Sequence, residues 1–332
     1  MRAKLVVACG VLAALVVASG GSAAPAKKIR VGLVTDIGGL HDRGFNQLSY
    51  AGLKRAEAKL GVGGRVILSK QNADYVPNLS SLARQGYDLV IAVGFLMTDA
   101  VDAVATKFPN TKFAIIDVDQ SQLKHKPRNV RGLLFREQEG GYLIGYLAGL
   151  VTKDQGGPQV VGVVGGIKIP PVDRFAGGFK AGARAADPGI KVLVDYSQDF
   201  VAQGKCKEIA LNHIAAGSQV EFADAGGCGL GVHDAAKEKG IWSLGGDADQ
   251  SYLGPQILSS ELKKVDVAVY QTIRAASAGR FKGGGNSIFT TANGGIGIGK
   301  ISPKISPSIV AKVMAVKKKM AAGKIRNIPL AP

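Results

Sequence analysis

Residues 31–47 read VGLVTDIGGLHDRGFNQ and set a pattern that the rest of the chain repeats. The first residues are apolar and predict a short buried strand, and the last ones open an amphipathic helix near Phe45. Between them, Gly38 and Gly39 permit backbone angles that other residues avoid. Polar side chains remain at the carboxyl end of this strand, where ligands bind in open α/β sheets: Asp36, His41, Asp42 and Asn46.

The alternation of short β-rich runs and helical stretches continues along the chain, with Gly, Asp, Asn and Pro in the gaps. Strands are predicted at 29–35, 65–68, 89–93, 112–116, 130–135, 160–164, 191–195, 220–222 and 241–244. Helices are predicted at 45–60, 78–85, 97–107, 137–151, 173–186, 202–216 and 230–239. This order is typical of right-handed βαβ units and parallel sheets, so we expect an α/β fold.

The strands outnumber those of one ordinary parallel sheet, and the pattern breaks around 135–141, so we expect two sheet domains of similar build. After Trp242 the alternation fails, and the tail suits a chain that crosses back between the domains. Its parts are a run at 257–265, a helix at 266–279, a Gly-rich piece at 283–285, the segment NGGIGIG and a helix at about 307–322. We assign 27–130 and about 261–290 to an N-terminal α/β domain, and 131–260 and about 291–332 to a C-terminal α/β domain.

The first 26 residues are predicted to be a secretory signal peptide, because two basic residues precede an apolar run at 5–18 and the small polar sequence SGGSAAPA follows. Cleavage is expected near Ala24 or Ala26. No later segment reaches ~18 apolar residues, the length that a membrane span needs. We expect a soluble protein outside the cytoplasm, either secreted or periplasmic.

The three cysteines fall in two groups. Cys9 sits in VVAC, a loose lipoprotein-like box, so a lipid-anchored form is the alternative to cleavage further along. Cys206 and Cys228 are the only cysteines of the mature chain, and in an oxidising compartment we expect them to form a disulfide. Two buried free thiols are the alternative.

The net charge of +17 and the pI near 9.8 are compatible with an anionic partner. Lys and Arg are nevertheless spread along the chain, with one cluster at 317–319 on a predicted helix. No aromatic residues alternate with basic ones to form a base-stacking platform. We interpret the charge as a solvated surface and expect no nucleic-acid partner.

Motifs for a cofactor, a metal or catalysis are not found in the sequence. The Gly-rich segments 161–167, 226–232 and 294–300 lack the spacing of dinucleotide-binding and P-loop motifs. The four histidines occupy separate segments without metal-ligand spacing, and there is no G-x-S-x-G motif. We therefore expect no cofactor, no metal and no enzymatic activity.

Acidic and aromatic residues recur where predicted strands end: Asp36, Asp42, Asp117, Phe222 and Asp247. Each acid alone is also compatible with a turn or helix-capping role. Together, at the carboxyl edges of two sheets, they predict a cleft lined by hydrogen-bond acceptors and aromatic faces. Such a cleft suits a neutral polar ligand with many hydroxyl or amino donors.

Seven stretches resemble one family, the basic membrane proteins, which are substrate-binding lipoproteins of ABC transporters and include purine nucleoside receptors. They are VTDIGGLHDRGFNQ, VGFLMTDA, EGGYLIGYLAGL, VGVVGGIKIPPVDRFAGGFKAG, AGGCGLGVHDAAKEKG, GGDADQSYLGPQ and LKKVDVAVY. The resemblance implies the type I periplasmic-binding-protein fold, in which two doubly wound parallel-sheet domains are joined by three crossovers and enclose the ligand.

The resemblance also implies roles for individual residues. Two aromatic rings that sandwich a base correspond to Phe45 and Phe222, and the groups that bind the base edge correspond to Asn46 and Asp117. Ribose hydroxyls would be held by Asp247 and Lys263, with backbone groups of Gly226 and Gly227, while Asp36 and Asp42 belong to the first loop.

The chain departs from the family pattern at two positions and in its leader. Gly44 precedes Phe45 where the family usually has Ser or Ala, and Asp224 stands where the family is usually apolar. An added acid beside the cleft could alter the ligand. The leader has only the loose box at Cys9, which favours a free periplasmic form.

These observations predict a monomeric solute-binding protein of an ABC importer. By hinge closure it would capture a nucleoside-like ligand, most simply a purine nucleoside, and it would then deliver this ligand to a permease. Two alternatives keep the same fold: a sensor domain for a signalling partner, and a binder of another heterocycle such as a flavin. An extracellular enzyme acting on nucleosides is disfavoured, because the sequence has no acid–base or metal constellation.

Overall fold

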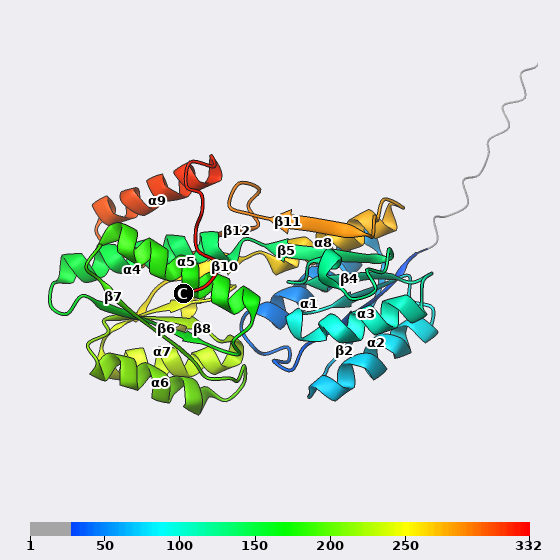
Figure 1. Cartoon of the computed structure of the whole chain (residues 1–332), viewed down its shortest axis with the longest axis horizontal. Helices are drawn as coiled ribbons and strands as arrows, with labels where there is room; N and C mark the ends of the chain where they lie inside the picture. Colours follow the sequence, from blue (N-terminus) through cyan, green and yellow to red (C-terminus); the bar gives the residue numbers. More distant parts are fainter. Residues whose placement is uncertain (1–27) are drawn as a thin grey trace, which may run out of the picture.

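The structure, a computed structural model, describes residues 28–332 and contains two six-stranded sheets. The predicted signal peptide, its cleavage site and Cys9 lie outside the described residues. The first sheet has the order β11-β5-β4-β3-β1-β2, and the second has the order β12-β10-β9-β8-β6-β7. Neighbouring strands are parallel throughout except for the antiparallel pair β10 and β12. Each sheet forms the centre of one lobe in Figure 1.

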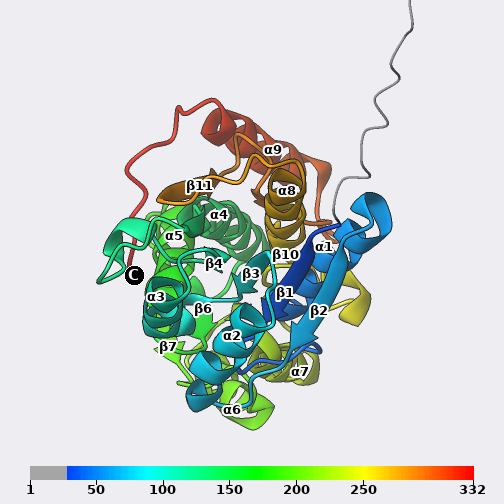
Figure 2. The ribbon, with the colours of Figure 1, turned by 90° about the vertical axis from the view of Figure 1, so that its right-hand side faces the viewer.

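The elements of the first domain are β1 (Arg30–Val34), α1 (Phe45–Leu60), β2 (Gly63–Ile67), α2 (Tyr75–Arg84), β3 (Leu89–Ala92), α3 (Thr98–Lys107), β4 (Lys112–Ile116), β5 (Val130–Phe135), α8 (Val265–Ser277) and β11 (Gly285–Phe289). One face of the sheet packs against α1 and α8 through a cluster that includes Leu53 and Val269. The other face packs against α2 and α3 through Leu82 and Val101. Figure 2 shows the helices on both sides of this sheet.

The elements of the second domain are α4 (Glu137–Gln155), β6 (Val160–Gly165), α5 (Pro170–Ala186), β7 (Lys191–Tyr196), α6 (Gln203–Ala215), β8 (Val220–Asp224), α7 (Leu230–Lys239), β9 (Trp242–Gly245), β10 (Ile257–Lys263), β12 (Ile296–Ile298) and α9 (Pro307–Ala321). Helices α4 and α5 cover one face of the sheet, and α6 and α7 cover the other. Helix α9 packs beside α4 through Val313.

The chain passes between the two sheets after β5, after β10 and after β11. The predicted type I arrangement with three crossovers is therefore confirmed. The strands divide the chain differently from our assignment at two places. Strand β5 belongs wholly to the first sheet, although we placed 131–135 in the C-terminal domain, because β5 pairs with β4 and β11 before the chain leaves. Strand β10 carries the second sheet as far as Lys263, beyond the expected boundary near 261.

Helix α5 begins at Pro170, three residues before the predicted start. Proline is favoured in the first turn of a helix, where its missing N–H has no intrahelical partner to lose. The glycines of EGGYLIGYLAGL have a packing role, because a Cβ atom at Gly145 would collide with the carbonyl oxygen of Phe179 on α5. Among the helices of residues 28–332, none is long and apolar enough to cross a membrane.

Cys206 on α6 and Cys228, in the short 3₁₀ turn after β8, form a disulfide with Cα atoms 5.7 Å apart. The predicted pairing is confirmed, and the alternative of two free thiols is wrong. The backbone N–H of Cys228 donates to the carbonyl oxygen of Phe200 at 3.0 Å. The disulfide therefore anchors the loop that carries Phe200.

Reduction of this disulfide is expected to lower the free energy of unfolding by about 3 kcal/mol, because it releases a chain constraint in the unfolded state. The constrained residues are separated by 22 positions in the sequence. Urea denaturation with and without reductant measures the loss. The double variant Cys206→Ala, Cys228→Ala is the control, since its transition should not respond to reductant; equal stability of the oxidised and reduced wild type would contradict the prediction.

Candidate functional site

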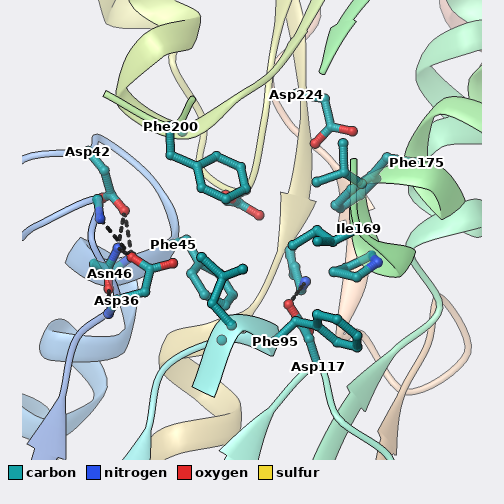
Figure 3. Close-up of a pocket in the computed structure, with 18 residues that line it drawn as sticks. Asp36, Asp42, Phe45, Asn46, Phe95, Asp117, Ile169, Phe175, Phe200 and Asp224 are labelled. Atoms are coloured by element: carbon teal, nitrogen blue, oxygen red, sulfur yellow. Dashed lines mark hydrogen bonds and ion pairs between the residues drawn. The ribbon is translucent and has the colours of Figure 1, made fainter. Parts of the chain in front are cut away.

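A pocket with an empty volume of about 600 Å³ lies between the two domains, at the carboxyl ends of the parallel strands. Its walls come from both domains, as Figure 3 shows. Of the predicted site residues, eight line it: Asp36, Asp42, Phe45, Asn46, Asp117, Gly226, Asp247 and Lys263. Phe222 and Gly227 do not.

The loop between β1 and α1 is organised by three polar side chains. The Asn46 amide donates to Asp36 Oδ1 at 2.6 Å and to Asp42 Oδ2 at 3.0 Å, and its oxygen accepts from the Asp36 backbone at 3.1 Å. Asp42 also accepts from the backbone N–H groups of Gly44, Asn46 and Gln47. Asp42 thus has the capping role that was the alternative to ligand binding. Because both amide hydrogens of Asn46 are engaged, this side chain positions the loop and is not free to donate to a ligand.

Burial raises the pKa values of the two carboxyl groups of this loop. It raises the pKa of Asp36 to about 6, although hydrogen bonds from Asn46 and Gly38 oppose the shift. Burial also raises the pKa of Asp42, against the hydrogen bonds that it accepts. His41, by contrast, is exposed. The loop therefore presents to the pocket a carboxyl group, Asp36, whose pKa is raised to about 6.

A buried ion-pair cluster forms the floor of the pocket, at the crossovers. Lys263, at the end of β10, is 2% exposed, and its Nζ lies 2.7 Å from Asp117 Oδ2 and 3.1 Å from Glu137 Oε1. Its ammonium also lies 5.1 Å from the ring centre of Phe45 and 5.6 Å from that of Phe175. Burial lowers the pKa of Lys263, but the neighbouring carboxylates outweigh this effect and raise it overall. Lys263 therefore stays charged.

Asp117 has a positive φ of 69° directly after β4. A positive φ is uncommon for a non-glycine residue and is often found at functional sites. Its Oδ2 is bound to Lys263, whereas its buried Oδ1 has no hydrogen-bond partner among residues 28–332. The described protein therefore leaves one carboxylate oxygen of Asp117 without a donor.

Two further acids, Asp224 and Asp247, stand at the carboxyl ends of β8 and β9 and line the pocket. Burial raises the pKa of Asp247 to about 7, with Lys263 opposing the shift. Burial raises the pKa of Asp224 well above its ordinary value, and Asp247 and Glu261 add to this effect. A Cβ atom at Gly44 would lie 3.0 Å from Asp247 Oδ2, so the glycine before Phe45 lets the first loop approach Asp247 closely.

The assignment of Phe222 to the second stacking ring requires correction. Phe222 lies inside β8, is fully buried, and packs against Phe179 with ring centres 5.7 Å apart and against Phe175 at 6.2 Å. A side chain in the interior of a strand points into the layer of helices, and only residues beyond the strand end reach the ligand edge. The aromatic residues of the second domain that do line the pocket are Phe175 and Phe200. Figure 3 places Phe200 opposite Phe45.

Phe200 was missed because it belongs to no regular element, but the sequence contained a usable signal. It follows the carboxyl end of β7, as Asp36 follows β1. Gly227 supports this loop instead of lining the pocket, since a Cβ atom there would lie 3.3 Å from the Phe200 carbonyl oxygen. Gly226 lines the pocket and has a positive φ of 54°.

The two domains also touch directly beside the pocket. The Gln250 amide donates to the carbonyl oxygen of Arg43 at 3.3 Å, and Gln250 Oε1 lies 2.9 Å from His233 Nε2. His233 is buried, as is His213, which contacts Glu221 and Asp195. Within the part of the chain that the structure describes, no group of three or more His, Cys, Asp or Glu residues is arranged to hold a metal ion.

Two parallel-sheet domains that enclose a pocket of acids and aromatic rings define a type I solute-binding protein. Within this class the chain belongs to the Bmp family, described as ABC transporter substrate-binding protein PnrA-like, whose match covers residues 29–328. The family suggested by the sequence motifs is confirmed. As a member of this class, the chain binds a small-molecule ligand and has a permease as its partner.

Several proteins are similar to this chain over most of its length. The "CD4+ T-cell-stimulating antigen" of Listeria monocytogenes is 35% identical in an alignment of length 324 that covers 90% of this chain and 88% of the antigen. The "ABC transporter nucleoside-binding protein BmpA" of Lactococcus lactis is 33% identical over 85% of this chain and 84% of its own. A solute-binding protein of an ABC transporter system from Aeropyrum pernix has a similar structure, with a TM-score of 0.81, 28% identity, and coverage of 91% and 94% of the two chains.

Proposed function

We propose that this protein captures a purine-nucleoside-like ligand in the interdomain pocket by hinge closure and presents it to the permease of an ABC importer. In this proposal the protein acts outside the cytoplasm, as a monomer, and has no enzymatic activity. The observation that carries the proposal is that Phe45 and Phe200 stand opposite each other in a pocket that also contains unsatisfied carboxylate oxygens of Asp117 and Asp224 (Figure 3). Aromatic faces stack on a flat heterocycle, and each stacked base is worth about 1–3 kcal/mol.

The polarity of the pocket supports this ligand class, because acidic side chains and aromatic rings line it together. Asp247 has no hydrogen-bond donor on its carboxylate in the described chain, so a vicinal diol could supply two O–H groups. The nucleoside-binding name of the Lactococcus lactis relative agrees with this choice.

The charges in the pocket favour a nucleoside over a nucleotide. Five aspartates line it, and the one lysine in its wall is already paired with Asp117 and Glu137. A phosphate would meet these acids without a free cation among the described residues of the pocket wall, and like charges at short range repel strongly. We therefore expect an unphosphorylated ligand.

Isothermal titration calorimetry against purine and pyrimidine nucleosides and their 5′-monophosphates tests the proposal. We expect saturable binding of a purine nucleoside and none of its monophosphate. Asp247→Ala should weaken binding by about 10- to 100-fold, since it removes a charge-assisted hydrogen bond. The matched control is Asp154→Ala, which removes an exposed acid at the end of α4. Absence of heat with every nucleoside would refute the nucleoside assignment.

A further inference from the structure

We propose that the ligand carries a protonated amino group on its sugar side, and that Asp224 selects such amino-substituted nucleosides over neutral ones. This inference rests on the proposed nucleoside function. It concerns Asp224, an acid that lines the pocket at the carboxyl end of β8.

Asp224 and Asp247 are neighbours at one edge of the second sheet. Strands β8 and β9 are parallel with Phe222 opposite Leu244, so the register places Asp224 beside Gly246, the residue before Asp247. A Cβ atom at Gly246 would lie 3.2 Å from the carbonyl oxygen of Ala223, which confirms the close approach of the two strand ends. Both acids line the main pocket and also a small adjoining cavity.

The side chain of Asp224 has no hydrogen-bond or ion-pair partner among the residues that the structure describes. Its Oδ2 is buried and accepts no hydrogen bond from any group of residues 28–332. Figure 3 shows its carboxylate projecting into the pocket near Phe175. A buried carboxylate without a donor is costly, and native proteins rarely keep one unless a ligand or a partner supplies the missing donor.

No basic side chain among the described residues of the pocket wall is free to pair with these acids. The ammonium of Lys263, the one basic group in the pocket wall, is bound to Asp117 at 2.7 Å and Glu137 at 3.1 Å. A third acid, Glu261, is fully buried behind the pair, with its Oε2 3.4 Å from the Asp247 backbone nitrogen. Burial raises the pKa values of Asp224 and Asp247, and repulsion from Asp247 and Glu261 raises that of Asp224 further; an adjacent cation would lower both pKa values again.

An organic ammonium is a better partner for Asp224 and Asp247 than a ribose diol or a metal ion. A ribose diol satisfies one carboxylate, so a neutral nucleoside bound to Asp247 leaves Asp224 without a donor. No set of metal ligands includes these acids within the described part of the chain. A primary ammonium carries three donors and one charge, and the ring of Phe175 beside Asp224 adds a favourable face for a cation.

Calorimetry at pH 7.5 with adenosine, 3′-amino-3′-deoxyadenosine and 5′-amino-5′-deoxyadenosine tests the inference. We expect at least one amino nucleoside to bind wild type about 10- to 100-fold more tightly than adenosine, the range of a charge-assisted hydrogen bond. Asp224→Asn should reduce that ratio to about one because the isosteric amide lacks the charge. The exposed-site control Asp154→Asn should preserve the ratio.

The possible outcomes separate this inference from the function on which it rests. If wild type binds adenosine as tightly as both amino nucleosides, the inference is wrong and the nucleoside function stands; this comparison needs no variant. If the amino preference persists in a folded Asp224→Asn protein, the assignment to Asp224 is wrong. If none of the three compounds binds, the proposed function fails and the inference fails with it.

Discussion

Lys263→Met is expected to lower the free energy of unfolding by about 3–5 kcal/mol, because breaking a buried ion pair leaves its partners uncompensated. The methionine replaces an ammonium that is 2% exposed and contacts both Asp117 and Glu137. Asp117 would then be buried without a cation, and Glu137 would keep only Arg174, whose Nη1 lies 3.4 Å from Glu137 Oε2. Urea denaturation at pH 7.5, followed by circular dichroism, measures the loss.

The adjacent Lys264 provides a matched control, because it is partly exposed and its side chain makes no ion pair or hydrogen bond within residues 28–332. Lys264→Met should change stability by less than about 0.5 kcal/mol. The triple variant Lys263→Met, Asp117→Asn, Glu137→Gln should recover part of the loss, since it removes the stranded charges. A Lys263→Met protein as stable as wild type would show that the cluster contributes nothing to the fold.

This cluster also has a consequence for closure. Lys263 ends β10 and Glu137 begins α4, so both residues lie where the chain crosses between the domains, whereas Asp117 belongs to the first sheet. The ion pairs therefore join the hinge region to the floor of the pocket. A ligand that contacts Asp117 Oδ1 and Asp247 would touch both domains, which is how a ligand stabilises a closed state selectively.

Much of the fold could be predicted from hydrophobic periodicity and from the residues that interrupt it. The strand, turn and helix of residues 31–47 appear where predicted, and α1 begins at Phe45. Polar residues at strand ends also identified most of the pocket. The domain boundaries were harder to predict from the sequence. Strand β5 pairs with β11, for example Gly132 with Asn286, and these residues are about 150 positions apart in the chain. The local sequence does not indicate such a distant pairing.

The roles of individual side chains could be predicted only in part. Asn46 was expected to contact the ligand, but its amide donates to Asp36 and Asp42 within the loop. These hydrogen bonds depend on side-chain geometry, which the spacing of residues in the sequence does not specify. The motif FADAGG contains a conspicuous aromatic residue, and the resemblance directed attention to it. Strand alternation puts Phe222 in the core, and the ring at the pocket comes from a loop without periodicity.

The matched substitutions Phe222→Ala and Phe200→Ala test this distinction between a core ring and a ligand-facing ring. Phe222→Ala should lower the free energy of unfolding by about 3–5 kcal/mol, the usual cost of deleting a buried phenylalanine. Phe200 is only partly buried, so Phe200→Ala should cost less stability. Its main effect should be on nucleoside binding, which we expect to weaken by about 5- to 150-fold, equivalent to about 1–3 kcal/mol of lost stacking.

The two measurements must be made on both variants, because a destabilised receptor also binds less when part of it is unfolded. Denaturant midpoints give the loss of stability, and calorimetry well below the unfolding transition gives the affinity of the folded fraction. The prediction requires that the two variants rank in opposite order in the two measurements. Phe222→Ala should lose more stability, and Phe200→Ala should lose more affinity for the nucleoside. If Phe222→Ala instead lost binding while remaining as stable as wild type, the ring at position 222 would be a ligand contact, and the packing against Phe175 and Phe179 would not describe the state that binds the ligand.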